Sequence, residues 1–208
     1  MHTEKELDRI AAKAAVACWL GEEGILAKRI QHDPLDRQLL ETWLKRWKLW
    51  GKNANVGEIE ALRKFLRGVK SQLPKQPVPE FVPRMVEQAK SDGLTRARLT
   101  SLISKFAFSC QPLAYVPYDS RGLAGLRALE FNVGDHDYVE YARCFTQIKP
   151  QIVSAVTKAG IRASRLKYCG QTLEQDVFEQ RAVDKRLMLY GRFPPDDMAK
   201  AYWDCDFK

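Results

Sequence analysis

The chain has few of the residues that build metal centres or disulfide frameworks. It contains three histidines and five cysteines in 208 residues, and no two cysteines form a Cys-x-x-Cys pair. An odd number of scattered cysteines predicts no disulfide framework, and histidines distant from any cysteine pair predict no zinc site. We therefore expect no metal or other cofactor, and a protein of the reducing cytoplasm.

Long apolar runs and nucleotide-binding loops are also missing. No segment approaches the roughly 18 apolar residues of a membrane span. Residues 1–24 mix both charges with a short alanine-rich run, which predicts an amphipathic helix rather than a signal peptide. No glycine-rich phosphate loop, kinase motif or Gly-x-Ser-x-Gly sequence occurs. We expect no membrane association and none of the enzyme classes that these motifs define.

The chain has fewer acidic than basic residues. The chain has 34 lysines and arginines against 26 aspartates and glutamates, a formal net charge of +8. This balance favours a polyanionic partner, because cations that neutralise phosphates release counterions. A hydrophobic content of 45% is enough for one sizeable core, or for two small lobes that share one.

Helical periodicity dominates what is present. Strand signals are thin, and the alternating segment "LAYVPY" is expected to be an extended loop because it is short and contains proline. We predict an all-α, two-lobed protein of about ten helices. The predicted helices cover residues 4–20, 33–50, 56–73, 80–92, 94–110, 119–129, 136–148, from Pro150 onward, and 173–190, with a basic linker at 161–171.

The proline-rich segment at residues 74–79 is the expected lobe boundary. Three prolines in six residues forbid a helix interior. We therefore expect an N-terminal helical lobe at residues 1–73 and a C-terminal helical lobe at 74–208, together forming one compact unit.

Asp119 follows the extended segment and precedes a predicted helix. It is well placed to be the N-cap, with its carboxylate accepting the N–H of Arg121 or Gly122. Capping and catalysis are compatible here, because a helix N-terminus favours a carboxylate's negative charge and fixes its direction. Such a group can stabilise a developing sugar cation or activate a water molecule.

Lys105 allows two interpretations. Its predicted helix carries an apolar stripe, and serines flank the lysine on the other side. A solvated lysine on a polar face is the simpler interpretation. Alternatively, the small serines open a slot in which the lysine loses hydration and acts as a nucleophile or a positioned cation.

Tryptophans and cations alternate in "WLKRWKLWGK". Interleaved aromatic and basic residues are typical of proteins that bind single strands or flipped bases. However, Trp43, Trp47 and Trp50 are spaced so that they share one helical stripe, which favours core packing with the cations on its flank. Two further basic clusters hold Arg96 and Arg98, and Lys158, Arg162, Arg165 and Lys167.

The segment "SLISKFAFSCQPLAYVPYDSRGLAGL" resembles the core of the helix-hairpin-helix DNA glycosylase superfamily. In that family a helix bearing a lysine leads through a loop to an aspartate that opens the next helix. "SK" matches the lysine with Lys105, and "YVPYD" matches the aspartate with Asp119. The resemblance covers residues 96–126. The glycine-containing hairpin that precedes the family's lysine is absent, which makes Asp119 the firmer of the two matches.

This resemblance implies an enzyme that flips a damaged or modified base out of double-stranded DNA and cleaves its N-glycosidic bond. Asp119 would stabilise the oxocarbenium-like transition state, and Lys105 would attack C1′ if the enzyme is also a lyase. DNA repair and defence against phage DNA are the implied roles, in a monomer associated with the nucleoid if the source is bacterial. The implied DNA contacts are Arg96, Arg98, Arg121, Arg162, Arg165 and Lys167, and the implied base-pocket residues are Tyr115, Tyr118 and Trp47.

Two alternatives stay open. A non-catalytic nucleic-acid-binding protein would keep the charge without the chemistry, and would show steep salt dependence with no abasic product. A helical interaction module would use its basic surface to bind an acidic protein. Neither alternative requires an aspartate after "YVPY".

Overall fold

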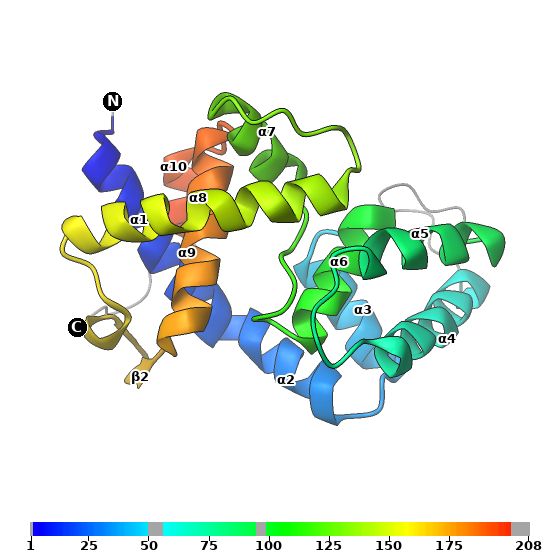
Figure 1. Ribbon diagram of the computed structural model, residues 1–208. Helices are drawn as coiled ribbons and strands as arrows, with labels where there is room; N and C mark the ends of the chain where they lie inside the picture. Colours follow the sequence, from blue (N-terminus) through cyan, green and yellow to red (C-terminus); the bar gives the residue numbers. More distant parts are fainter. Residues whose placement is uncertain (1, 50–55, 95–98, 201–208) are drawn as a thin grey trace. The chain divides into compact units, whose positions relative to one another are not determined.

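The computed structural model describes residues 2–49, 56–94 and 99–200 (Figure 1). Its content of 71% helix and 2% strand confirms the predicted all-α fold. The elements are α1 (Glu4–Cys18), the π-helix η1 (Trp19–Glu23), α2 (Gly24–His32), α3 (Arg37–Arg46), α4 (Val56–Gln72), α5 (Phe81–Ser91), α6 (Leu99–Cys110), α7 (Ser120–Ala128), α8 (Tyr138–Lys158), the 3₁₀ helix η2 (Ala163–Arg165), β1 (Lys167–Tyr168), β2 (Gln171–Thr172), α9 (Gln175–Tyr190) and α10 (Pro195–Ala199).

The chain divides into two compact units. Unit 1 consists of Met1–Gly24 and Tyr118–Lys208, and unit 2 is Ile25–Pro117. This division differs from the boundary expected between residues 73 and 74, because the proline-rich segment is a loop between α4 and α5 inside unit 2. Prolines show where a helix stops, whereas a unit is defined by which helices pack together.

Two helices continue through residues that were expected to end them. The first helix does not end at Gly21, because the wider π-turn of η1 carries it on into α2. Likewise, Pro150 lies inside α8 instead of opening a new helix. A proline removes one N–H from the helix, here the partner of the Thr146 carbonyl. Both Pro150 and Thr146 are exposed, so water can bond this carbonyl and the helix tolerates the loss.

Short polar side chains set several helix starts. Asp119 is the N-cap of α7, and Asp137 is the N-cap of α8, where it accepts the N–H of Glu140 at 3.0 Å. In α3 the cap is Asp36, which accepts the N–H of Leu39 at 2.7 Å, whereas the predicted helix starts at Asp33 with this residue as its cap, followed by Pro34. Asp33 instead follows α2 and its N–H donates to the Arg29 carbonyl, so α3 begins three residues later than predicted.

Unit 1 is built around α9, which packs against α1, α7 and α8 (Figure 1). Two glycines bring α7 and α9 unusually close together. A Cβ atom at Gly125 would lie 2.0 Å from the Leu187 carbonyl oxygen, and one at Gly191 would lie 2.0 Å from the Arg121 carbonyl oxygen. Only glycine permits these backbone contacts, which hold α7, and with it Asp119, against α9.

We expect Gly125→Ala to destabilise the protein by about 3 kcal/mol, because the added methyl group overlaps backbone atoms that cannot rotate away. Gly68→Ala is the matched control. Gly68 also lies inside a helix, α4, but its added Cβ would meet only the Gln72 amide nitrogen at 3.8 Å. This control should stabilise the protein by about 0.5–1 kcal/mol. Denaturant unfolding of both variants checks the prediction, and equal effects would contradict the close packing of α7 on α9.

Candidate functional site

The chain returns from unit 2 to unit 1 at Tyr118, and Asp119 is the next residue. Its backbone is extended, at φ −137° and ψ 142°, and its Oδ1 accepts the N–H of Arg121 at 2.9 Å. This confirms the predicted N-cap. The side chain is half-buried, so it is held in a fixed direction and still reaches the surface of the unit. The positive end of the α7 dipole favours its negative charge.

Two tyrosines line the start of α7. Tyr118 is buried and its ring centroid lies 4.9 Å from that of Tyr141 on α8. The Tyr118 hydroxyl oxygen accepts the N–H of His136 at 3.0 Å. The Tyr141 hydroxyl lies so close to α7 that a Cβ at Gly122 would be 2.5 Å from it. Burial, together with the charges of Asp184 and Asp119, raises the pKa of Tyr141 well above its ordinary value, so this hydroxyl remains a protonated donor.

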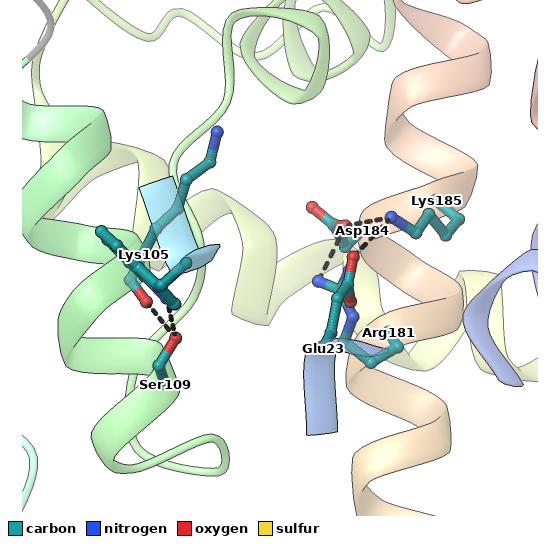
Figure 2. A network of polar contacts seen from close by, with 7 residues as sticks. Glu23, Lys105, Ser109, Arg181, Asp184 and Lys185 are labelled. Atoms are coloured by element: carbon teal, nitrogen blue, oxygen red, sulfur yellow. Dashed lines mark hydrogen bonds and ion pairs between the residues drawn. The ribbon is translucent and has the colours of Figure 1, made fainter. Parts of the chain in front are cut away.

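A buried network of four charged side chains lies in the same unit (Figure 2). Arg181 on α9 bonds Glu23 of η1 at 2.5 Å and Asp184 at 3.0 Å. Lys185 lies 3.6 Å from Glu23 and 3.8 Å from Asp184. The Arg181 side chain is 0% exposed and those of Glu23 and Asp184 are 6% and 5% exposed. Two acids and two bases make the network formally neutral, which offsets part of the desolvation cost.

Asp184 connects this network to Asp119. Burial raises the pKa of the Asp184 carboxyl, the cations of Arg181 and Lys185 oppose this, and the negative charge of Asp119 adds to it. The negative charges of Asp119 and Asp184 therefore repel each other. The network balances the charge of Asp184 with Arg181 and Lys185, so that Asp119 does not face an uncompensated buried anion.

Sequence reasoning missed all four residues of the network. A signal for the three members on α9 was present in the sequence, where Arg181, Asp184, Lys185 and Arg186 stand among the apolar residues of the helix. When charged and core residues are mixed on every face of a helix, the helix has no separate polar face that it could turn toward solvent. That pattern indicates a helix surrounded by protein, with charges that require partners from other elements.

Lys105 lies in unit 2, on α6, and is 6% exposed. The interpretation as a solvated surface lysine is therefore wrong, since the flanking serines are buried as well. Their hydroxyls turn back on the helix: Ser104 donates to the Ser101 carbonyl at 3.1 Å, and Ser109 donates to the Lys105 carbonyl at 2.9 Å. The Lys105 amine extends away from this carbonyl (Figure 2) and lies 5.5 Å from the Trp47 ring centroid, a cation–π contact.

The tryptophans of α3 divide between core and cation contact. Trp43 is fully buried, and its indole N–H donates to the Ser109 hydroxyl at 2.9 Å, which confirms core packing for this residue. Trp47 is half-buried at the end of α3, with its ring 6.0 Å from Phe108. Trp50 lies outside the described residues.

The remaining predicted site residues fall into three groups. Tyr115 is a core residue of unit 2, 2% exposed, with its ring 5.9 Å from Phe81. Arg96 and Arg98 lie outside the described residues. Four of the predicted DNA contacts are exposed in unit 1: Arg121 in the first turn of α7, and Arg162, Arg165 and Lys167 after α8. Of the predicted site residues, unit 1 thus contains Asp119, Tyr118 and these four DNA contacts, and unit 2 contains Lys105, Trp47 and Tyr115.

Two further properties concern the described ranges 2–49, 56–94 and 99–200. Within them, no three or more histidine, cysteine, aspartate or glutamate side chains gather in a way that could hold a metal ion. No helix in these ranges has the length and apolar character needed to cross a membrane.

No protein-family model, curated protein or solved structure matches this chain.

Proposed function

We propose that this protein is a DNA glycosylase that excises a damaged or modified base and leaves an abasic site. The observation that carries the proposal is the placement of Asp119. Its carboxylate caps α7, is half-buried, and is held by the Arg121 N–H beside buried tyrosines. The excess of positive charge supports a DNA substrate.

Cleavage of an N-glycosidic bond leaves positive charge on the sugar as the base departs. A carboxylate fixed near C1′ stabilises that charge without any reorganisation at the moment of reaction. Asp119 has one oxygen engaged by the helix N-terminus, which orients the group toward the substrate or toward an attacking water. The Tyr141 hydroxyl remains protonated close to the same turn of α7, so it is a hydrogen-bond donor there.

Lys105 is the proposed nucleophile if the enzyme is also a lyase. Its amine would attack C1′, the N-glycosidic bond would break, and the base would leave with the bonding electrons and take up a proton. Loss of a proton from the attached nitrogen and opening of the sugar ring would then give a Schiff base. Burial beside Trp47 removes water from the side chain, and the ammonium of the cation–π contact must release its proton to water before the amine can attack.

Borohydride trapping tests this role of Lys105. We expect the wild type to form a covalent complex with substrate DNA under borohydride, and Lys105→Gln to form none. Lys64→Gln changes an exposed lysine of the same unit and should trap like the wild type. Base release without any trapped complex would show that the enzyme is a monofunctional hydrolase that does not use Lys105 as its nucleophile.

The proposal itself is tested with genomic DNA that carries a wide range of damaged and modified bases. Mass spectrometry of the released bases, combined with a count of abasic sites, should show release of at least one base class. The identity of that base would decide between a role in DNA repair and a role in defence against phage DNA. Absence of release from every such substrate would contradict the proposal.

A non-catalytic DNA-binding protein is the second candidate, because exposed cations follow α8 and would serve binding without chemistry. This candidate predicts salt-dependent binding to duplex DNA and no released base. The same incubation therefore discriminates between the two.

A further inference from the structure

The chain has no aspartate or glutamate between Glu140 and Glu174, but this stretch contains six cations. Two of them have carboxylate partners, since Arg143 pairs with Glu140 at 2.5 Å and Lys149 lies 3.8 Å from Glu179. The other four are exposed, and none forms an ion pair with any residue that the structure describes: Lys158, Arg162, Arg165 and Lys167. Lys158 ends α8, and the other three follow it within nine residues.

These cations lie on a folded element and not on the basic linker that the sequence suggested. The Arg165 N–H bonds the Arg162 carbonyl at 3.0 Å in η2. Lys167 then pairs with Thr172, and Tyr168 with Gln171, in an antiparallel hairpin. Its two-residue turn consists of Cys169 and Gly170, both with positive φ, at 47° and 78°. This is the backbone geometry that tight hairpins require. We call residues 158–172 the basic hairpin.

Buried residues alternate with the cations of the basic hairpin. Ile161, Ala163 and Leu166 are buried, whereas Arg162, Arg165 and Lys167 are exposed. Tyr168 adds an anchor on η1, because its hydroxyl lies 3.2 Å from the place of a Cβ at Gly21. The buried residues hold the backbone against unit 1, so the cations project into solvent from fixed positions.

We propose that the basic hairpin binds the phosphate backbone of duplex DNA and supplies much of the sequence-independent affinity. This inference rests on the proposed function in taking DNA as the partner. Guanidinium and ammonium groups bind phosphate oxygens through charge-assisted hydrogen bonds. No carboxylate within the hairpin competes for them.

The chemistry of the surface favours a duplex backbone over other partners. Protein interfaces are centred on buried aromatic or aliphatic anchors. The large hydrophobic residues exposed in the described chain are Ile25, Val78 and Leu113, all outside the basic hairpin. Single-stranded DNA requires exposed aromatic rings for stacking, whereas Tyr168, the hairpin's aromatic residue, packs beside Gly21.

The salt dependence of DNA binding is the first test. A variant with Lys158, Arg162, Arg165 and Lys167 all changed to Gln should bind an undamaged 30-base-pair duplex more weakly than the wild type. The slope of log K against log salt should become shallower by about 3 to 4, since each phosphate contact contributes about 0.9. Lys90→Gln/Lys200→Gln is the control, because these exposed lysines already pair with Glu87 and Asp197. Its slope should stay close to that of the wild type.

Cys169 provides a second measurement that does not alter the cations. This thiol is exposed at the tip of the hairpin, whereas Cys18 and Cys110 are half-buried and Cys144 is buried. With Cys205 changed to Ser, maleimide should label Cys169 first. At a concentration of duplex DNA that binds nine-tenths of the protein molecules, the labelling rate of Cys169 should fall about tenfold.

An unchanged salt slope in the four-residue variant, with Cys169 labelled equally fast in the presence of DNA, would overturn the inference. Binding of the protein to polyglutamate in preference to DNA through the basic hairpin would overturn the inference as well, and would indicate an acidic protein partner. Base release by the wild type would leave the glycosylase proposal intact in either case. Conversely, a shallower slope and a protected Cys169 without base release would support the DNA-binding hairpin and contradict the glycosylase.

Discussion

Asp119→Asn is expected to slow base release by about 10²–10³-fold, the usual cost of removing one group that stabilises charge in a transition state. The substitution keeps the shape of the side chain and removes its negative charge. An asparagine caps a helix about as well as an aspartate, so its side-chain oxygen should still accept the Arg121 N–H. We therefore expect an unchanged thermal midpoint and unchanged DNA binding, measured beside single-turnover base release.

Asp137→Asn is the matched control for this variant. Asp137 caps α8 in the same unit and accepts the Glu140 N–H in the same way, but it is exposed. Its replacement should leave base release at the wild-type rate. Asp119→Ala should lose both the charge and the cap, and so cost about 1 kcal/mol of stability in addition to activity. Full base release by Asp119→Asn would show that the carboxylate acts only as a cap.

Arg181→Met is expected to lower the free energy of unfolding by about 3–5 kcal/mol. This substitution leaves Glu23 and Asp184 buried with Lys185 as the remaining cation of the network, which changes its formal charge from 0 to −1. An uncompensated buried charge costs far more than the lost ion pair contributes. Denaturant unfolding and hydrogen exchange at the amides of α9 together measure the loss and locate it in unit 1.

Two controls separate charge burial from general damage. Arg37→Met breaks an exposed pair with Glu41, in which the arginine side chain is 47% exposed, and should cost less than about 1 kcal/mol. Glu23→Gln added to Arg181→Met removes one of the two acids and returns the formal charge of the network from −1 to 0. The double variant should therefore recover about 1 kcal/mol or more relative to Arg181→Met alone. A double variant less stable than the single one would contradict the charge-compensation argument.

The helical character of the fold could be predicted from the sequence, since apolar periodicity depends on local spacing. The expected N-cap at Asp119 was confirmed for the same reason, because a cap bonds an N–H only two residues away. The errors at Gly21 and Pro150 arose where surroundings override local preference. At Gly21 the helix continues through a π-turn beside Tyr168. At Pro150 the carbonyl that loses its hydrogen-bond partner is exposed to water.

The candidate site was predictable only where it is local. Asp119 was found through its position after a proline-containing extended segment. The residues that share its environment could not be found in this way, because Glu23 and Arg181 are 158 positions apart in the chain. The burial of Lys105 depends on Trp47 and on helix packing within unit 2, which the serine spacing alone left open. Likewise, the basic hairpin forms through a turn at Cys169 and Gly170 that its composition did not indicate.

The most direct measurement compares wild type, Asp119→Asn and Asp137→Asn on genomic DNA that carries many kinds of damaged and modified bases. Released bases and abasic sites are quantified from the same reactions. We predict that the wild type and Asp137→Asn release the same base at equal rates, and that Asp119→Asn releases it about 10²–10³-fold more slowly. No release by the wild type, or equal release by all three proteins, would contradict a glycosylase that depends on Asp119.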